Sequence, residues 1–229
     1  MTTTIVTTCK GRGKQLALAL TSWLEETPCP IVVALDGCPD VHAFDNRARV
    51  VRTTAAESDL FSKPRALNTG ARAVDTDNIL FLDSDTVLRP GFWDWYRRRV
   101  TPDALFVVPP RSVHRDLTGV LGVATREFWA VHGADEGFVG WGAEDLDLRL
   151  RLHLKRSLRV VDIPIEFVFA IPHDDDLRTQ FYSEKDKMAS HTKNIQRLVD
   201  NAEAISGQSI WQLLELPEVK RLFLLTERP

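Results

Sequence analysis

The sequence predicts an α/β fold in which a mostly parallel central sheet is flanked by helices. Through the first two thirds of the chain, short apolar and β-branched runs alternate with segments whose apolar residues recur at helical spacing. The runs at 31–35 and 79–82 are apolar throughout, which is typical of strands buried on both faces of a parallel sheet. This alternation of strands and helices favours parallel strands that are covered by helices.

The elements up to residue 82 follow from local composition. The β-branched run at 3–8 indicates a first strand, and Leu16 and Trp23 lie on one helical face. Ser62 and Pro64 are typical of a helix start, as N-cap and early helical position. We therefore expect strands at 3–8, 31–35 and 79–82, a weaker strand at 50–51, and helices around 16–24 and 62–74.

Beyond residue 85 the pattern is less regular. Leucines at even positions from 146 to 154 alternate with charged or polar residues, which by period alone indicates a strand. Leu, Arg and Lys favour helices, and 145–155 has no β-branched residue, so we expect a helix there. The other expected elements are a helix at 92–100, strands at 105–108, 119–124 and 166–170, and a short helix around Phe128.

We expect one domain, with residues 1–176 as the core and 177–229 as a helical extension packed on it. The segment 177–204 is polar and 210–225 is amphipathic. Packing against the core is the expected role of the amphipathic stretch, while contact with a membrane surface or a second subunit stays open. The sequence does not set the oligomeric state.

The composition is that of a globular protein, with 44% hydrophobic and 27% charged residues among 229. A net charge of -3 gives no general attraction to nucleic acid, so no nucleic-acid partner is expected. No apolar stretch approaches the roughly 20 residues of a membrane span, and the N-terminus lacks a secretory signal pattern. Three cysteines without C-x-x-C spacing fit free thiols. We expect a cytoplasmic protein, with a peripheral position on the inner face of the membrane left open.

Asp83-Ser84-Asp85 is the most informative segment, because it directly follows the apolar run 79–82. Open α/β sheets bind ligands outside the carboxyl ends of their strands. Two carboxylates one residue apart suit a divalent cation, which in turn can hold a diphosphate. A turn is the alternative, since Asp and Ser are common turn formers.

A second acidic pair, Glu144-Asp145, follows Gly140-Trp141-Gly142. Exposed amides at a helix start stabilise carboxylates as anions, and a carboxylate beside an indole ring can act as a general base while the ring stacks on a ligand. The glycines would let the backbone approach that ligand closely. The alternative is an ordinary acidic first turn beside a buried Trp.

Two further features carry weaker signals. Arg65, Asn68 and Arg72 lie at spacings of three and four, hence on one helix face, next to Lys63. They could hold a diphosphate or sugar, although solvated helix faces have the same pattern. His173 could be a third metal ligand, because imidazole suits manganese better than calcium; a solvated surface histidine is the alternative.

Together, an apolar strand ending in Asp83-x-Asp85, the downstream G-W-G-x-E-D at 140–145 and the later His173 resemble GT-A-type glycosyltransferases. The closest likeness is to the inverting family 2, which includes bacterial polysaccharide synthases. The motifs are also similar to those of β-1,4-galactosyltransferases and polypeptide N-acetylgalactosaminyltransferases. The resemblance covers roughly Thr3 to His173 and implies a single GT-A, Rossmann-like domain.

The resemblance also implies roles for individual residues. Those near the donor nucleotide-sugar would be Thr7, Thr8, Arg12, Asp36, Lys63, Arg65, Asn68, Asp83 and Ser84. The ligands of Mn²⁺ or Mg²⁺ would be Asp83, Asp85 and His173. The acceptor side would comprise Trp141, Gly142 and Glu144, and the catalytic pair would be Asp145 as base with Glu144.

The implied reaction transfers a sugar from a UDP-sugar to a hydroxyl acceptor, with inversion. The acceptor stays open among a glycan, a lipid-linked glycan, a protein and a small molecule. One alternative is a retaining enzyme of the same fold, and another is a catalytically silent module that binds a sugar nucleotide or glycan. The anomeric configuration of the product separates the first alternative, and dependence on the Asp145 base separates the second.

Overall fold

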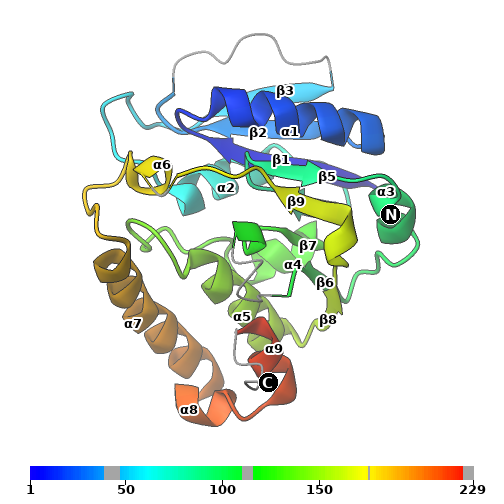
Figure 1. Ribbon diagram of the computed structural model, residues 1–229. Helices are drawn as coiled ribbons and strands as arrows, with labels where there is room; N and C mark the ends of the chain where they lie inside the picture. The colour runs from blue at the N-terminus through cyan, green and yellow to red at the C-terminus, as the bar shows by residue number, and fades with distance from the viewer. Residues whose placement is uncertain (39–46, 110–115, 175, 224–229) are drawn as a thin grey trace.

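The computed structural model describes residues 1–38, 47–109, 116–174 and 176–223. At its centre is a seven-stranded sheet with the strand order β3-β2-β1-β4-β7-β6-β8 (Figure 1). These strands are β1 (Thr3–Cys9), β2 (Ile31–Leu35), β3 (Ala48–Arg52), β4 (Asn78–Phe81), β6 (Ala104–Val107), β7 (Leu121–Ala124) and β8 (Arg159–Asp162).

The sheet is parallel except at one strand. β1 pairs in parallel with β2 and β4, β2 with β3, and β6 with β8. β7 runs antiparallel to both of its neighbours, β4 and β6. The predicted α/β class with a mostly parallel sheet is therefore confirmed. The reversal at β7 was not predicted, because a short apolar strand carries no signal of its direction.

Helices cover both faces of the sheet. Successive residues of a strand point to opposite faces, so neighbouring residues of β1 pack against different helices. Ile5 packs in one apolar cluster with residues of α1 (Gly13–Glu26) and α3 (Phe92–Arg97). Its neighbour Val6 packs in a second cluster with residues of α2 (Lys63–Arg72), α4 (Thr125–Ala130) and α5 (Glu144–Arg156).

The helix expected at 145–155 is confirmed as α5. Leu148, Leu150 and Leu152 are all buried, and so are Arg149 and Arg151 between them. A helix enclosed on several sides does not need one polar and one apolar face. This enclosure explains why the sequence shows alternation where a simple amphipathic period would be expected.

The C-terminal helices α7 (Lys187–Ser206), α8 (Ile210–Leu213) and α9 (Pro217–Leu222) follow the short helix α6 (Asp176–Thr179). Leu198, Leu213 and Leu222 are buried in the same apolar cluster as Val6. These helices therefore lie on the side of the sheet away from α1 (Figure 1). Within the described ranges, no helix combines the length and apolar character needed to cross a membrane.

Two expectations need correction, and two strands were missed. The helix expected at 92–100 ends at Arg97. The strand expected at 166–170 begins as a 3₁₀ turn, η2 (Ile165–Phe167), and only β9 (Val168–Ala170) is extended. β9 pairs antiparallel with β5 (Thr86–Leu88) in a separate small sheet. β5 and β8 were not expected, because runs of three or four residues are too short to show a period.

Candidate active site

One pocket of about 250 Å³ lies where the segments after β1 and β4 meet the start of α5. This is the carboxyl edge of the parallel strands, the usual ligand-binding edge of an α/β sheet. The residues predicted from sequence that line it are Thr8, Arg12, Lys63, Asp83, Ser84, Asp85, Trp141, Gly142, Glu144 and Asp145.

Asp83-Ser84-Asp85 forms a turn and also faces the pocket. The Thr86 amide donates to the Asp83 carbonyl at 2.9 Å, so the segment closes a tight turn. Ser84 and Asp85 are nonetheless only 5% exposed, and the whole segment lines the pocket. The segment is therefore a turn that faces the pocket, so the turn posed as an alternative from the sequence does not exclude a role in binding a ligand.

Lys63 joins the two acidic pairs across the pocket. Its Nζ lies 2.8 Å from Asp83 Oδ1, 2.8 Å from Asp145 Oδ2 and 3.9 Å from Glu144 Oε1. Ser62 caps the helix that carries this lysine, with its hydroxyl accepting from the Arg65 amide. Burial alone would lower the pKa of Lys63, but the carboxylates of Asp145 and Asp83 hold it well above its usual value.

Glu144 is the least satisfied member of this cluster. Burial and the neighbouring Asp145 carboxylate raise the pKa of Glu144 from 4.5 to about 7. Its Oε2 is buried without a hydrogen-bond partner among the described residues. A protonated Glu144 could donate a hydrogen bond into the pocket, whereas an ionised one adds charge beside Asp145.

This buried carboxyl predicts a pH-dependent gain in stability for Glu144→Gln. The pKa of Glu144 is higher in the folded protein than in the unfolded chain, so its ionisation opposes folding as pH rises from 4.5 to about 7. We expect the variant to be more stable than wild type at pH 8 by about 1–3 kcal/mol and equally stable near pH 4. Urea unfolding at both values measures the difference; a gain that is the same at both values contradicts the assignment.

Asp85, His173 and Arg12 form a second cluster at the pocket edge. Asp85 Oδ2 lies 2.8 Å from His173 Nε2 and 2.9 Å from Arg12 Nη1. The small β5–β9 sheet makes this approach possible, because the Ile171 amide donates to the Asp85 carbonyl at 2.8 Å. Burial would raise the pKa of Asp85, but the hydrogen bond with His173 and the Arg12 charge hold it below its usual value.

The predicted metal ligands fit a divalent cation in part. Asp85 and His173 already meet, and a carboxylate with an imidazole suits Mn²⁺. The Asp83 carboxylate is turned toward Lys63 instead. In the described parts of the chain, no three His, Cys, Asp or Glu side chains are grouped so as to hold a metal ion. A cation there would need Asp83 to turn from Lys63 toward Asp85.

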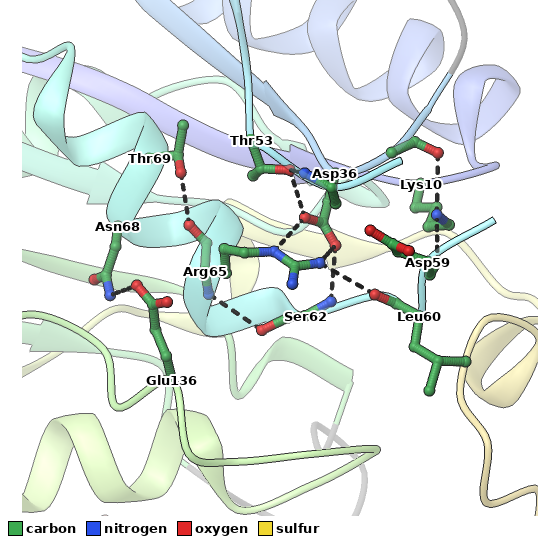
Figure 2. A network of polar contacts seen from close by, with 12 residues as sticks. Lys10, Asp36, Thr53, Asp59, Leu60, Ser62, Arg65, Asn68, Thr69 and Glu136 are labelled. Carbon is green, nitrogen blue, oxygen red and sulfur yellow. Dashed lines mark hydrogen bonds and ion pairs between the residues drawn. The ribbon is translucent and has the colours of Figure 1, made fainter. Parts of the chain in front are cut away.

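Asp36 lies outside the pocket in a closed network with Arg65 (Figure 2). Arg65 donates to both carboxylate oxygens at 2.8 Å, Thr53 Oγ1 donates at 2.7 Å and the Ser62 amide at 2.8 Å. Asp36 is completely buried. These four bonds occupy its accepting positions, so Asp36 and Arg65 anchor the start of α2, behind the pocket.

Asn68 and Thr7 also lie away from the pocket. Asn68 bonds to the backbone of Ala134 through both its amide nitrogen and its oxygen, at 2.9 and 2.8 Å, and to Glu136 at 2.8 Å. Thr7 is fully buried within β1, and its hydroxyl has no partner among the described residues. The family resemblance implies that both residues lie near the donor; in the structure neither of them lines the pocket.

Several pocket residues were missed by sequence reasoning. Lys10 is buried, and its ammonium donates to the carbonyls of Gly37, Glu57 and Asp59 at 2.8–3.1 Å. The other missed residues include Phe61, Phe181, Tyr182 and His191. Three of these come from the C-terminal extension, which the sequence suggested was scaffold. Aromatic side chains often line ligand pockets, so their residue type was a usable signal. Their position beside this pocket depends on tertiary contacts that the sequence does not show.

Trp141 is held against the N-terminal part of α7. Its amide donates to Ser190 Oγ at 2.7 Å, and that hydroxyl donates back to the Trp141 carbonyl at 3.1 Å. The Lys187 ammonium lies 4.7 Å from the indole centroid, and the His191 ring lies 5.8 Å from it. Gly142 has a φ of 99°, a left-handed conformation that favours glycine. The G-W-G segment is therefore a fixed wall of the pocket.

Gly119 leaves room for the Asp83 carboxylate, and this predicts a loss of function for Gly119→Ala. An added Cβ would overlap Asp83, which Lys63 holds in place. We expect a ligand that contacts Asp83 to bind about tenfold more weakly. Gly207→Ala is the control: its left-handed φ costs stability, but no atom lies within 4 Å of the added Cβ. Equal effects of the two variants on the affinity for UDP, the nucleotide that the sequence resemblance implies, measured by calorimetry, would contradict this role of Gly119.

Residues 108–174 match the family model described as the N-terminal domain of galactosyltransferase. The matched segment includes the G-W-G-x-E-D motif and His173. Human β-1,4-galactosyltransferase 4 is 31% identical over 110 residues, which is 44% of this chain and 32% of that protein. The chain thus spans about a third of the length of this curated relative.

Solved structures are similar over almost the whole chain. TarS 1–349 from S. aureus in complex with UDP-GlcNAc has a TM-score of 0.66 at 15% identity, over 97% of this chain and 72% of that one. The chain has a GT-A fold. GalNAc-T7 with UDP, GalNAc and Mn²⁺ has a TM-score of 0.61 at 14% identity, over 87% of this chain and 48% of that one. In this GT-A fold, the pocket contains Asp83-Ser84-Asp85 on one side and the start of α5 on the other.

Proposed function

We propose that the chain is a glycosyltransferase that uses a UDP-sugar and a divalent cation to glycosylate a hydroxyl acceptor. The observation that carries this proposal is the pocket in which the aspartates after β4 meet the acidic start of α5 across Lys63. The galactosyltransferase match over 108–174 supports the reaction class. The structural neighbours hold UDP or UDP-GlcNAc, and one also holds Mn²⁺.

On the donor side, Asp85 and His173 would hold Mn²⁺ or Mg²⁺, with Asp83 as the third ligand after it leaves Lys63. When bound, the cation would offset the negative charge that develops on the departing diphosphate. Arg12 and Lys63 place two further positive charges at the pocket and would bind phosphate oxygens. Thr8 and Ser84 would lie beside the nucleotide, while Thr7, Asp36, Arg65 and Asn68 support this side from behind.

On the acceptor side, Asp145 would take the proton of the attacking hydroxyl. A hydroxyl is a poor nucleophile until a positioned base removes its proton. Asp145 now pairs with Lys63, so donor phosphate that draws Lys63 away would free the base when it is needed. Glu144 would orient the acceptor hydroxyl, and Trp141 with Gly142 would form the surface on which the acceptor ring stacks.

We further propose that transfer inverts the anomeric centre, as in the family 2 enzymes that the sequence resembles. Direct attack by a hydroxyl activated at Asp145, on the face opposite the diphosphate, gives inversion. NMR of the product measures its anomeric configuration. We expect the configuration opposite to that of the donor, and a retained centre would contradict the inverting mechanism.

A screen of UDP- and GDP-sugars for Mn²⁺-dependent hydrolysis tests the proposal without knowledge of the acceptor. We expect at least one UDP-sugar to be hydrolysed with Mn²⁺ and protected by EDTA. Hydrolysis that does not depend on the cation would contradict the metal assignment.

Acceptor classes still to be compared are glycans, lipid-linked glycans, proteins and small molecules. We also propose a cytoplasmic location, with a peripheral position on the inner face of the membrane left open; three cysteines that form no disulfide in the described structure are in keeping with a reducing compartment.

A further inference from the structure

Arg149 is a completely buried cation on α5 that does not line the pocket. Its guanidinium donates to the carbonyls of Val108 at 3.2 Å and Val120 at 3.1 Å, and also to the carbonyl of Thr118. Among the described residues it has no ion pair, and its Nε has no hydrogen-bond partner. A buried, incompletely satisfied charge is costly to a scaffold, so its presence needs a reason beyond packing.

The carbonyls that Arg149 binds belong to the backbone behind Asp83. Thr118 and Val120 flank Gly119, and Gly119 is the residue whose added Cβ would overlap the Asp83 carboxylate. By holding both neighbours of Gly119, Arg149 fixes the surface against which Asp83 rests. The opposite side of Asp83 is fixed by Lys63 at 2.8 Å.

Arg149 is also positioned to interact with Asp145, the proposed catalytic base. It follows Asp145 by four residues on α5, so the two side chains lie on one face of the helix. Burial lowers the pKa of Arg149 to about 10, while the charges of Asp145 and Asp83 oppose that shift. The guanidinium therefore stays charged near neutral pH and attracts both carboxylates from behind the pocket.

We propose that Arg149 is a positioning residue, which keeps the Thr118–Val120 backbone, the surface against which the Asp83 carboxylate rests, in place relative to the acidic start of α5. The proposal deepens the proposed function and rests on it, because Asp83 and Asp145 would contact donor and acceptor. Displacing either group by about 1 Å is enough to cost about 100-fold in rate. Arg149 would act through the Thr118–Val120 backbone and through its charge, without touching substrate.

Arg151 offers a matched control on the same helix. It is also buried, and it donates to the carbonyls of Val131 and Gly133 at 2.7 and 2.9 Å. Its charge is paired with Asp147 at 2.7 Å, and it does not line the donor pocket. Arg149→Lys and Arg151→Lys each keep a positive charge while removing the fixed fork of donors.

Calorimetric titration of UDP with Mn²⁺ separates positioning from folding, because affinity and the number of binding sites are measured together. We expect Arg149→Lys to raise the Kd for UDP about tenfold with about one site per chain, and Arg151→Lys to leave the Kd within about twofold. Arg149→Lys with Gly119→Ala should weaken binding by less than the product of the single effects, because both act through Asp83.

Other outcomes overturn the inference in distinguishable ways. A reduced number of sites with an unchanged Kd would mean that Arg149 only supports folding. Equal rises in Kd for the two lysine variants would remove any special role for Arg149. If wild-type protein fails to bind UDP, the proposed function fails and this inference fails with it.

Discussion

Replacing Asp145 by Asn is expected to abolish sugar transfer while leaving Mn²⁺-dependent UDP binding nearly intact. The amide keeps the size of the side chain and can still accept from Lys63, but it cannot take the acceptor proton. General base catalysis contributes about 100- to 10,000-fold to a rate, so the loss in kcat should fall in that range. Transfer assays and UDP calorimetry on the same preparation measure both quantities.

Asp147→Asn is the matched control for this variant. Asp147 lies on the same helix but pairs with Arg151 and Asn201 outside the pocket. We expect this control to lose some stability and to keep kcat within about twofold per folded molecule. An Asp145→Asn variant with full transfer activity would show that another group is the base. A variant that also loses UDP binding would show that Asp145 belongs to the donor side.

Replacing Lys63 by Met is expected to lower both the free energy of unfolding and the affinity for the donor. The change removes a buried ammonium that lies 2.8 Å from both Asp83 and Asp145. Breaking a buried ion pair by removing one partner costs about 3–5 kcal/mol, because the remaining charges are left uncompensated. The stability loss should shrink as pH falls, since the carboxylates can then take up protons. Denaturant unfolding at pH 8 and pH 5 measures this dependence.

A double variant and a surface control sharpen the Lys63 test. Adding Glu144→Gln to Lys63→Met removes one of the buried carboxylates that have lost the Lys63 ammonium. It should therefore restore part of the lost stability at pH 8. Lys193→Met, at an exposed position on α7, should change stability by no more than about 0.5 kcal/mol. A Lys63→Met variant that is destabilised equally at both pH values would contradict the electrostatic role of Lys63.

The α/β fold and the places of the two acidic pairs, at a strand end and a helix start, were predictable because their signals are local. An all-apolar run before Asp83-Ser84-Asp85 marks the end of a buried strand, and a strand end fixes which edge of the sheet the carboxylates occupy. The acidic start of α5 was predictable for the same reason, since glycines and carboxylates at a helix start follow local backbone chemistry.

The rest of the site depends on contacts between distant residues. The sequence placed Lys63 near the donor, but not as the bridge to Asp145, which is 82 residues away. The resemblance placed Asp36 and Arg65 beside the donor, which stays a prediction, and no local pattern shows that the two side chains bind each other. His191 reaches the pocket from α7, which packs along α5, and Tyr182 reaches it from the segment between α6 and α7.

Calorimetric titration of UDP into the wild-type protein, with and without Mn²⁺, tests the central proposal most directly. The pocket that joins Asp83-Ser84-Asp85 to Lys63 predicts saturable binding of about one UDP per chain that requires the cation and is weakened by Asp83→Asn. Absence of UDP binding with Mn²⁺ present, by a protein shown to be folded, would contradict it.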